Sequence, residues 1–121
     1  MHAYARAHGL LAVGPGDRVL DLGGGTGYGA ALLAAQVGPT GAVVSVEIDP
    51  ALSARARANV DAPQVTCIEG DALDPATWQA HVAALRKVVV GFALESLPSS
   101  WLAALTPGTI VVAPLRVGGQ L

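Results

Sequence analysis

The run from Val19 to Gly29 (VLDLGGGTGYG) constrains the fold of this chain more than any other stretch. Its apolar residues surround one acid, Asp21, and four of the five residues from 23 to 27 are glycine. Glycine adopts positive φ angles and lets a backbone approach a ligand closely. The run therefore predicts a buried strand, a tight turn and a helix over 27–37, whose free N–H groups point back at the turn.

The composition fits one domain, residues 1–121, built around a buried sheet. Hydrophobic residues make up 52% of the sequence and aromatic residues only 4%. Ala, Val and Leu carry this apolar content, which suits parallel strands covered on both faces by Ala-rich helices. The net charge is −2, and the 7 Lys and Arg residues do not cluster. We therefore expect no nucleic-acid partner.

Because Cys67 is the single cysteine, the chain cannot form an internal disulfide and contains no cysteine-based metal-binding motif. Cys67 is expected to fill the core of a central strand. The spacing of the three histidines does not indicate a metal site either. The sequence contains no uninterrupted apolar run of membrane-spanning length and no signal-peptide pattern. We expect a soluble protein in a reducing, cytoplasmic compartment, with no membrane partner.

Five apolar, β-branched runs alternate with helical patterns along the chain. The strands are expected at 18–22, 42–48, 65–69, 87–93 and 110–114, and the helices at 1–12, 27–37, 50–60, 74–85 and 98–105. This alternation predicts an α/β fold, a Rossmann-like open parallel sheet with right-handed crossovers and helices on both faces. Trp78 and Trp101 are expected to pack helices against the sheet.

Three acids stand at the expected carboxyl ends of strands: Asp21, Glu47 and Asp71. In an open parallel sheet, ligands bind at these ends, where the strand order reverses. Each acid also has a purely structural interpretation: Asp21 as a turn cap, Glu47 as a solvated strand end, and Asp71 as a helix or turn cap. Because all three occur at one edge, a ligand site is the favoured interpretation.

Two ligand classes compete for this geometry. Residues 25–30 match the dinucleotide pattern G-x-G-x-x-A, and Glu47 lies at a suitable distance to bind ribose hydroxyls. S-adenosyl-L-methionine uses the same strand, turn and helix but carries no pyrophosphate, and its amino-acid end suits an acid such as Asp21. Asp71 is placed to meet the amine of an adenine. These acids favour a methyltransferase, and a nicotinamide-dependent oxidoreductase remains the alternative.

The chain resembles protein-L-isoaspartate (D-aspartate) O-methyltransferases along nearly its whole length. The matching segments are MHAY at 1–4, GDRVLDLG at 16–23, GTGY at 25–28, VVSVE at 43–47, EGD at 69–71, PSSWLAAL at 98–105, TPG at 106–108, IVVAP at 110–114 and VGG at 117–119. The glycine turn is common to many methyltransferases, whereas the MHAY start and the late segments are more specific. The resemblance implies a class I methyltransferase core with strand order 3-2-1-4-5 that lacks the final strands.

The resemblance also implies which residues contact the cofactor. They are His2, the turn glycines Gly23, Gly25 and Gly27, Glu47 at the ribose, and Asp71 with Ala72 near the adenine. It further implies methyl transfer to the carboxylate of an isoaspartyl or aspartyl residue in a protein or peptide. A subset found with modified-peptide biosynthesis has a similar Pro-Leu-Arg at 114–116, which would make the acceptor one dedicated peptide. No nucleophile and base pair stands out, so no catalytic residue is assigned, as suits a reaction activated by the sulfonium itself.

Several departures from the family concern the acceptor side. The family has a serine-containing loop before the MHAY helix and further strands after the fifth, and the given sequence shows neither of them. In addition, Asp71-Ala72 replaces the Asp-Gly of the family. We therefore expect an intact cofactor half that binds weakly and methylates poorly unless a partner covers it. A non-catalytic remnant that binds a cofactor or a partner is the alternative. The fifth strand would present an apolar edge, which favours self-association.

Overall fold

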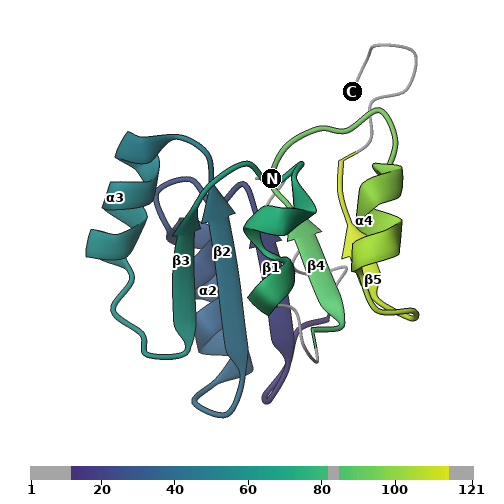
Figure 1. The fold of residues 1–121 in the computed structure, drawn as a ribbon. Helices are drawn as coiled ribbons and strands as arrows, with labels where there is room; N and C mark the ends of the chain where they lie inside the picture. The colour runs from purple at the N-terminus through teal and green to yellow at the C-terminus, as the bar shows by residue number, and fades with distance from the viewer. Residues whose placement is uncertain (1–11, 82–84, 115–121) are drawn as a thin grey trace.

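The computed structural model describes residues 12–81 and 85–114. Its centre is a five-stranded sheet with the order β3-β2-β1-β4-β5, in which every neighbouring pair is parallel (Figure 1). The strands are β1 (Arg18–Leu22), β2 (Ala42–Glu47), β3 (Val65–Glu69), β4 (Lys87–Val90) and β5 (Ile110–Val112). The predicted Rossmann-like architecture and strand order are confirmed. The helix expected over 1–12 and the candidate residue His2 lie outside the described residues, apart from Ala12.

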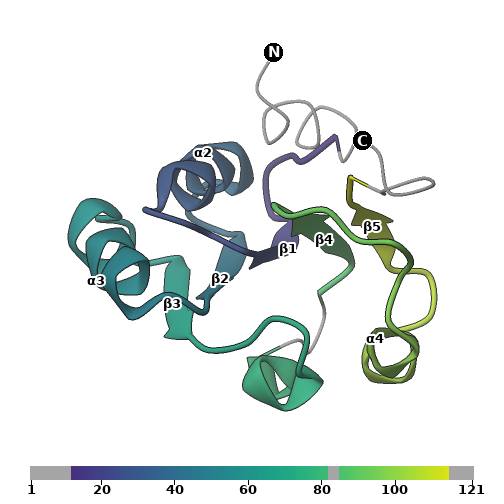
Figure 2. The same cartoon turned by 90° about the horizontal axis from the view of Figure 1, so that it is seen from above.

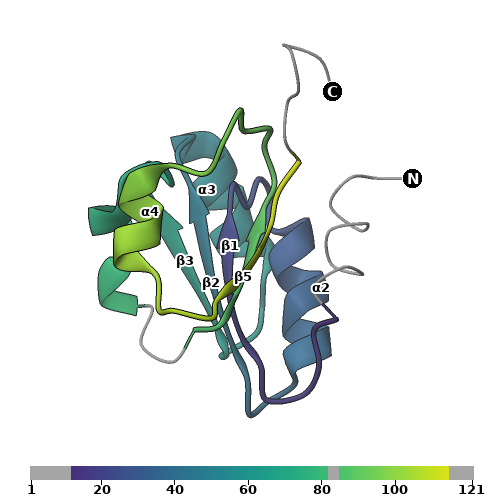
Figure 3. The ribbon, with the colours of Figure 1, turned by 90° about the vertical axis from the view of Figure 1, so that its right-hand side faces the viewer.

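Helices cover the sheet on both faces. Helix α2 (Tyr28–Val37) lies on one face, and α4 (Ser99–Ala104) lies on the other, together with the 3-10 turns η1 (Pro75–Thr77) and η2 (Gln79–His81) (Figure 2). Figure 3 shows the same separation of α2 and α4 from the side. Helix α3 (Pro50–Asn59) follows β2 and contacts β2 and β3. No helix in the described part of the chain combines the length and the apolar character needed to cross a bilayer.

The alternation of side chains along β1 divides the core into two clusters. Val19 joins the cluster beneath α2, with Leu33 and Val43, whereas Leu20 and Leu22 join the cluster on the opposite face. Both faces of β1 are therefore buried, as expected for a central parallel strand. The strand can carry one polar side chain, Asp21, only if a neighbouring strand supplies a hydrogen-bond partner.

Two tryptophans organise the cluster opposite α2. Trp78 is fully buried, and its Nε1 donates a hydrogen bond to the carbonyl oxygen of Ala72 at 2.9 Å. Its ring meets that of Trp101 edge to face, with centroids 6.3 Å apart. The prediction that these two rings pack against the sheet is confirmed. Because Ala72 comes three residues after β3, Trp78 also holds the backbone just beyond the carboxyl end of that strand.

The structure corrects two expectations. The continuous helix predicted over 74–85 is wrong, because residues 75–81 form two 3-10 turns, η1 and η2. Asp74 caps the first turn by accepting a hydrogen bond from the Ala76 N–H, and the Trp78 N–H donates to Pro75 three residues back. This tighter winding accompanies the burial of the Trp78 ring. Cys67 lies in β3 at the edge of the sheet and is partly exposed, so it does not fill the core of a central strand.

Candidate functional site

The glycine turn joins β1 to α2 and is anchored on the neighbouring strand β2. The N–H groups of Gly23 and Gly24 both donate to the carbonyl oxygen of Val46, at 2.8 and 3.0 Å. Gly23 has a φ of +84°, and Gly27, which caps α2, has a φ of +99°. A Cβ atom on Gly27 would lie 2.7 Å from Val60 Cγ2, so α3 approaches the turn as closely as glycine permits.

Asp21 lies buried beneath this turn. It faces Ser45 in the register of β1 and β2, and its Oδ2 accepts a hydrogen bond from Ser45 Oγ at 2.8 Å. Oδ1 has no hydrogen-bond partner among the described residues. Burial raises the pKa of Asp21 from 3.8 to about 7; the Ser45 hydrogen bond opposes the rise and the charge of Glu47 adds to it. The carboxyl therefore supports the turn from inside the protein.

Glu47 ends β2 and connects the glycine turn to the start of α3. Its Oε1 accepts a hydrogen bond from the Gly25 N–H at 2.8 Å, and its Oε2 accepts one from the Asp49 N–H at 2.9 Å. Asp49 in turn caps α3 by accepting hydrogen bonds from Ala51 and Leu52. Backbone contacts on both sides therefore orient the Glu47 carboxylate at the carboxyl edge of the sheet.

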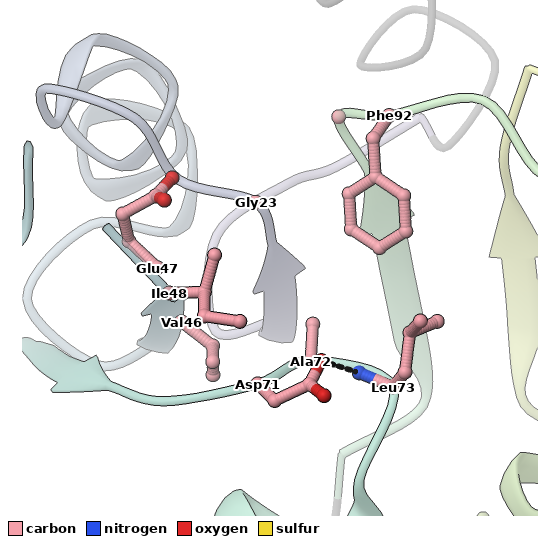
Figure 4. A pocket seen from close by; sticks show the side chains of 9 residues that line it. Gly23, Val46, Glu47, Ile48, Asp71, Ala72, Leu73 and Phe92 are labelled. Atoms are coloured by element: carbon pink, nitrogen blue, oxygen red, sulfur yellow. Dashed lines mark hydrogen bonds between the residues drawn. The ribbon is translucent and has the colours of Figure 1, made fainter.

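A pocket of about 400 Å³ opens at the carboxyl ends of the central strands (Figure 4). This volume falls within the range of small-molecule sites, roughly 300–1,000 Å³. The lining residues are Gly23, Val46, Glu47, Ile48, Asp71, Ala72, Leu73, Gly91 and Phe92. The wall thus combines apolar side chains with two carboxylates and the backbone of the turn, which suits a ligand with both a flat apolar part and polar groups.

The structure brings together four of the residues expected at the site: Gly23, Glu47, Asp71 and Ala72 all line the pocket. Asp71 also accepts a hydrogen bond from the Leu73 N–H at 2.9 Å, so its interpretation as a turn cap is correct as well (Figure 4).

The other expected residues that the structure describes do not line the pocket. Gly25 and Gly27 shape the turn, and the N–H of Gly25 is engaged by Glu47. Asp21 is fully buried below the turn. Three acids therefore converge on one edge of the sheet, but only Glu47 and Asp71 reach the pocket itself.

Sequence reasoning missed four apolar side chains of the pocket: Val46, which is buried within β2, and Ile48, Leu73 and Phe92. Ile48 and Leu73 are 63% and 49% exposed, although both are large and hydrophobic. They come one and two residues after the strand-end acids Glu47 and Asp71, so the positions after each acid were the available signal. Phe92, the only phenylalanine of the chain, comes two residues after β4. Its position past a strand end was a comparable signal.

Acids gather at this edge without forming a metal centre. Within residues 12–81 and 85–114, no group of three or more His, Cys, Asp or Glu side chains could hold a metal ion. The chemistry available to the described site is therefore that of carboxylates, backbone groups and an apolar wall.

Comparison with known proteins agrees with this geometry. Residues 1–120 match the family described as protein-L-isoaspartate(D-aspartate) O-methyltransferase (PCMT). The protein-L-isoaspartate O-methyltransferase of Ignicoccus hospitalis is 37% identical over 104 residues, which are 84% of this chain and 48% of that protein. The chain thus spans about half the length of the curated relatives it matches.

Solved structures share the same core. A protein-L-isoaspartate O-methyltransferase superposes with a TM-score of 0.75 at 28% identity, covering 93% of this chain and 36% of that one. An RNA methyltransferase from Salinibacter ruber, in complex with S-adenosyl-L-homocysteine, superposes with a TM-score of 0.72 at 28% identity, covering 92% and 72%. The fold is that of class I methyltransferases, and the family match favours this interpretation over a nicotinamide-dependent oxidoreductase. By its sequence and its fold, the chain belongs to the protein-L-isoaspartate (D-aspartate) O-methyltransferase family.

Proposed function

We propose that this chain is a single cofactor-binding domain, residues 1–121, that binds S-adenosyl-L-methionine for carboxyl O-methylation of isoaspartyl or aspartyl residues. The observation that carries the proposal is the pocket between Glu47 and Asp71 beside the glycine turn. Family membership supports both the methyl donor and the type of acceptor. The modification would serve protein repair or the maturation of a peptide.

The pocket would accommodate the parts of this cofactor in a definite order. The adenine would lie between Ile48 and Leu73, with its amine near Asp71. The ribose hydroxyls would meet Glu47, whose carboxylate is already oriented by two backbone N–H groups. The amino-acid end would then extend along Gly23. Each polar part thus has a polar neighbour, and the flat ring has apolar walls.

The remaining candidate residues would act less directly. Gly25 and Gly27 would hold the turn in its left-handed conformation, and Asp21 would support it from below. Ala72 would pack beside the adenine. His2, retained from the family resemblance, would contact the cofactor from the segment before β1. The sulfonium supplies the activation for methyl transfer, so these residues mainly bind and orient, and none is assigned a catalytic role.

Isothermal titration tests the cofactor assignment. Wild-type protein should bind S-adenosylhomocysteine and not NAD, because Glu47 occupies the Gly25 N–H that a pyrophosphate would need and sets a carboxylate beside the turn. Glu47→Ala should weaken binding by roughly tenfold or more, since it removes the ribose contact and frees the Gly25 N–H. Glu69→Ala is the matched control, because Glu69 ends the neighbouring strand but does not line the pocket. A preference for NAD would overturn the assignment.

Methyl transfer from radiolabelled donor to an isoaspartyl peptide separates an enzyme from a cofactor-binding remnant. The remnant remains the second candidate because the described residues of the site bind and orient, and none of them has an assigned catalytic role. We expect weak transfer by the wild type and its loss in Glu47→Ala. Cofactor binding without transfer to any isoaspartyl or aspartyl peptide would favour the remnant instead.

The proposed partners and location follow the same reasoning. The acceptor is a protein or peptide, and the pattern around Pro114 supports one dedicated peptide. The acidic balance of the chain argues against a nucleic-acid partner. We propose a cytoplasmic location because the single cysteine, Cys67, is a free thiol, as suits a reducing compartment. We also propose that the protein self-associates through the edge of β5, the last strand of the sheet.

A further inference from the structure

We propose that the ring of Phe92 contacts the sulfonium centre of the bound cofactor and makes the site prefer the charged methyl donor to the neutral thioether product. This inference rests on the proposed function and adds a residue that selects between donor and product. It is carried by the position of one aromatic side chain in the pocket.

Phe92 lies directly against the glycine turn. A Cβ atom on Gly23 would stand 2.7 Å from Phe92 Cδ1 and 3.2 Å from Cε1, so only glycine at position 23 lets the ring approach this closely. Figure 4 shows Gly23 between Glu47 on one side and Phe92 on the other. The ring is partly buried against the core cluster beneath it, so its place in the pocket is supported by packing.

The order of the cofactor's parts brings its sulfur to this place. With the ribose at Glu47 and the amino-acid end along Gly23, the sulfur that joins them would lie beside the turn, within reach of the ring. Among the described residues that line the pocket, Phe92 is the only aromatic one. The Cδ1–Cε1 edge of the ring meets Gly23, and Figure 4 shows the face of the ring turned toward the viewer beside the turn. The face of an aromatic ring attracts a cation through its quadrupole. The product sulfur is neutral and lacks this attraction, so the ring would bind the donor more strongly than the product.

The carboxylates of the site also attract a cation, and their effect can be separated from that of the ring. Glu47 and Asp71 line the pocket. Their Coulombic attraction does not depend on whether residue 92 is aromatic. A substitution at position 92 that keeps the apolar volume therefore changes the ring's contribution alone.

Titration of S-adenosylmethionine and S-adenosylhomocysteine into the same variants tests the inference. Phe92→Leu should lower the ratio of donor affinity to product affinity by roughly three- to tenfold, whereas Phe92→Tyr should preserve it. Leu73→Ala is the control, because it removes an apolar contact that both ligands share and should weaken both equally. Phe92→Met serves as a second non-aromatic variant if the leucine variant does not fold.

Because the chain contains a single phenylalanine, biosynthetic labelling reaches position 92 alone. Mono-, tri- and pentafluorophenylalanine progressively weaken the negative face of the ring with little change in its shape. The donor-to-product ratio should fall stepwise along this series, and the fluorine resonance should shift differently with the two ligands. A ratio that stays constant across the series, with both ligands bound, would overturn the role of Phe92 and leave the proposed function standing. Failure of the wild type to bind either ligand would overturn both.

Discussion

The buried carboxyl of Asp21 shows how one residue can serve a site without touching its ligand pocket. Its Oδ2 accepts the Ser45 hydroxyl hydrogen bond, and both side chains pack under Gly24. The register of β1 and β2 places the two residues opposite each other. Cross-strand pairs of this kind stabilise neighbouring strands. Here the pair also fills the space on which the glycine turn rests.

Loss of the Ser45 hydroxyl should therefore destabilise the fold. Ser45→Ala removes the donor to Asp21 and should lower the free energy of unfolding by about 1–3 kcal/mol, because a buried acceptor loses its partner. Ser53→Ala is the matched control, since the Ser53 hydroxyl is equally buried and has no partner among the described residues. Urea denaturation of both variants measures the difference. Equal effects would contradict the role of the pair.

The raised pKa of Asp21 predicts a pH-dependent stability. The folded protein holds this carboxyl protonated up to about pH 7, whereas its ordinary pKa is 3.8. Folding thus favours the neutral form, and this contribution is full below the ordinary pKa and is lost as pH rises toward about 7. Unfolding midpoints of the wild type should fall relative to those of Asp21→Asn across this window. Because other carboxyls, such as Asp17 with its lowered pKa, titrate in both proteins, only the difference is informative. Parallel curves would argue against the assignment.

At the scale of elements, the glycine turn determines how closely α2 and α3 approach each other. Gly27 begins α2 and faces Ala56 and Val60 at the end of α3. A Cβ atom at position 27 would lie 3.1 Å from the Ala56 Cα atom, a backbone atom that cannot move alone. The two helices that flank the site are therefore held at a distance that only glycine allows.

Substitution of Gly27 should therefore lower the free energy of unfolding by more than the unfavourable backbone angle alone would. Gly27→Ala combines a positive φ with a clash, and we expect a loss of about 2 kcal/mol or more in unfolding free energy. Gly108→Ala, in the turn that the Thr109 N–H closes onto the carbonyl oxygen of Thr106, also has a positive φ but meets no atom within 4 Å. It should cost only about 1 kcal/mol. Thermal unfolding of the two variants compares them, and a similar loss in both would show that the clash relaxes.

At the scale of the whole molecule, the sheet leaves β5 at one edge. Within the described residues, β5 pairs with β4 alone, and Ile110 at its start is half exposed. An unpaired, apolar strand edge is a template for pairing with another chain. The proposed self-association belongs to this edge.

A charge at the edge should therefore prevent association. We expect the wild type to form dimers whose fraction rises with protein concentration, and Ile110→Lys to remain monomeric, because lysine on an edge strand blocks pairing. Leu102→Lys is the control, since Leu102 is similarly exposed but lies on α4. Sedimentation velocity distinguishes these outcomes. A wild type that stays monomeric at high concentration would rule out the β5 edge as an interface.

Local patterns in the sequence determined the order of elements and the glycine turn. β-branched runs, glycine clusters and proline positions act through the backbone angles of a few neighbouring residues, so they can be interpreted along the chain. The strand-end acids could be predicted for the same reason. The helix over 74–85 was predicted wrongly because the burial of Trp78 against Ala72 and Trp101 depends on distant segments.

Only the tertiary structure decided what each strand-end residue does. The sequence alone placed both Asp21 and Glu47 at the ligand, yet the first lies buried against Ser45 and the second lines the pocket. Likewise, the contact of Phe92 with Gly23 joins residues that are far apart in the chain. Burial and pairing depend on which strands become neighbours, and this property belongs to the assembled sheet. The sequence by itself determined the edge at which a ligand would bind, and the packing of the sheet determined which side chains reach it.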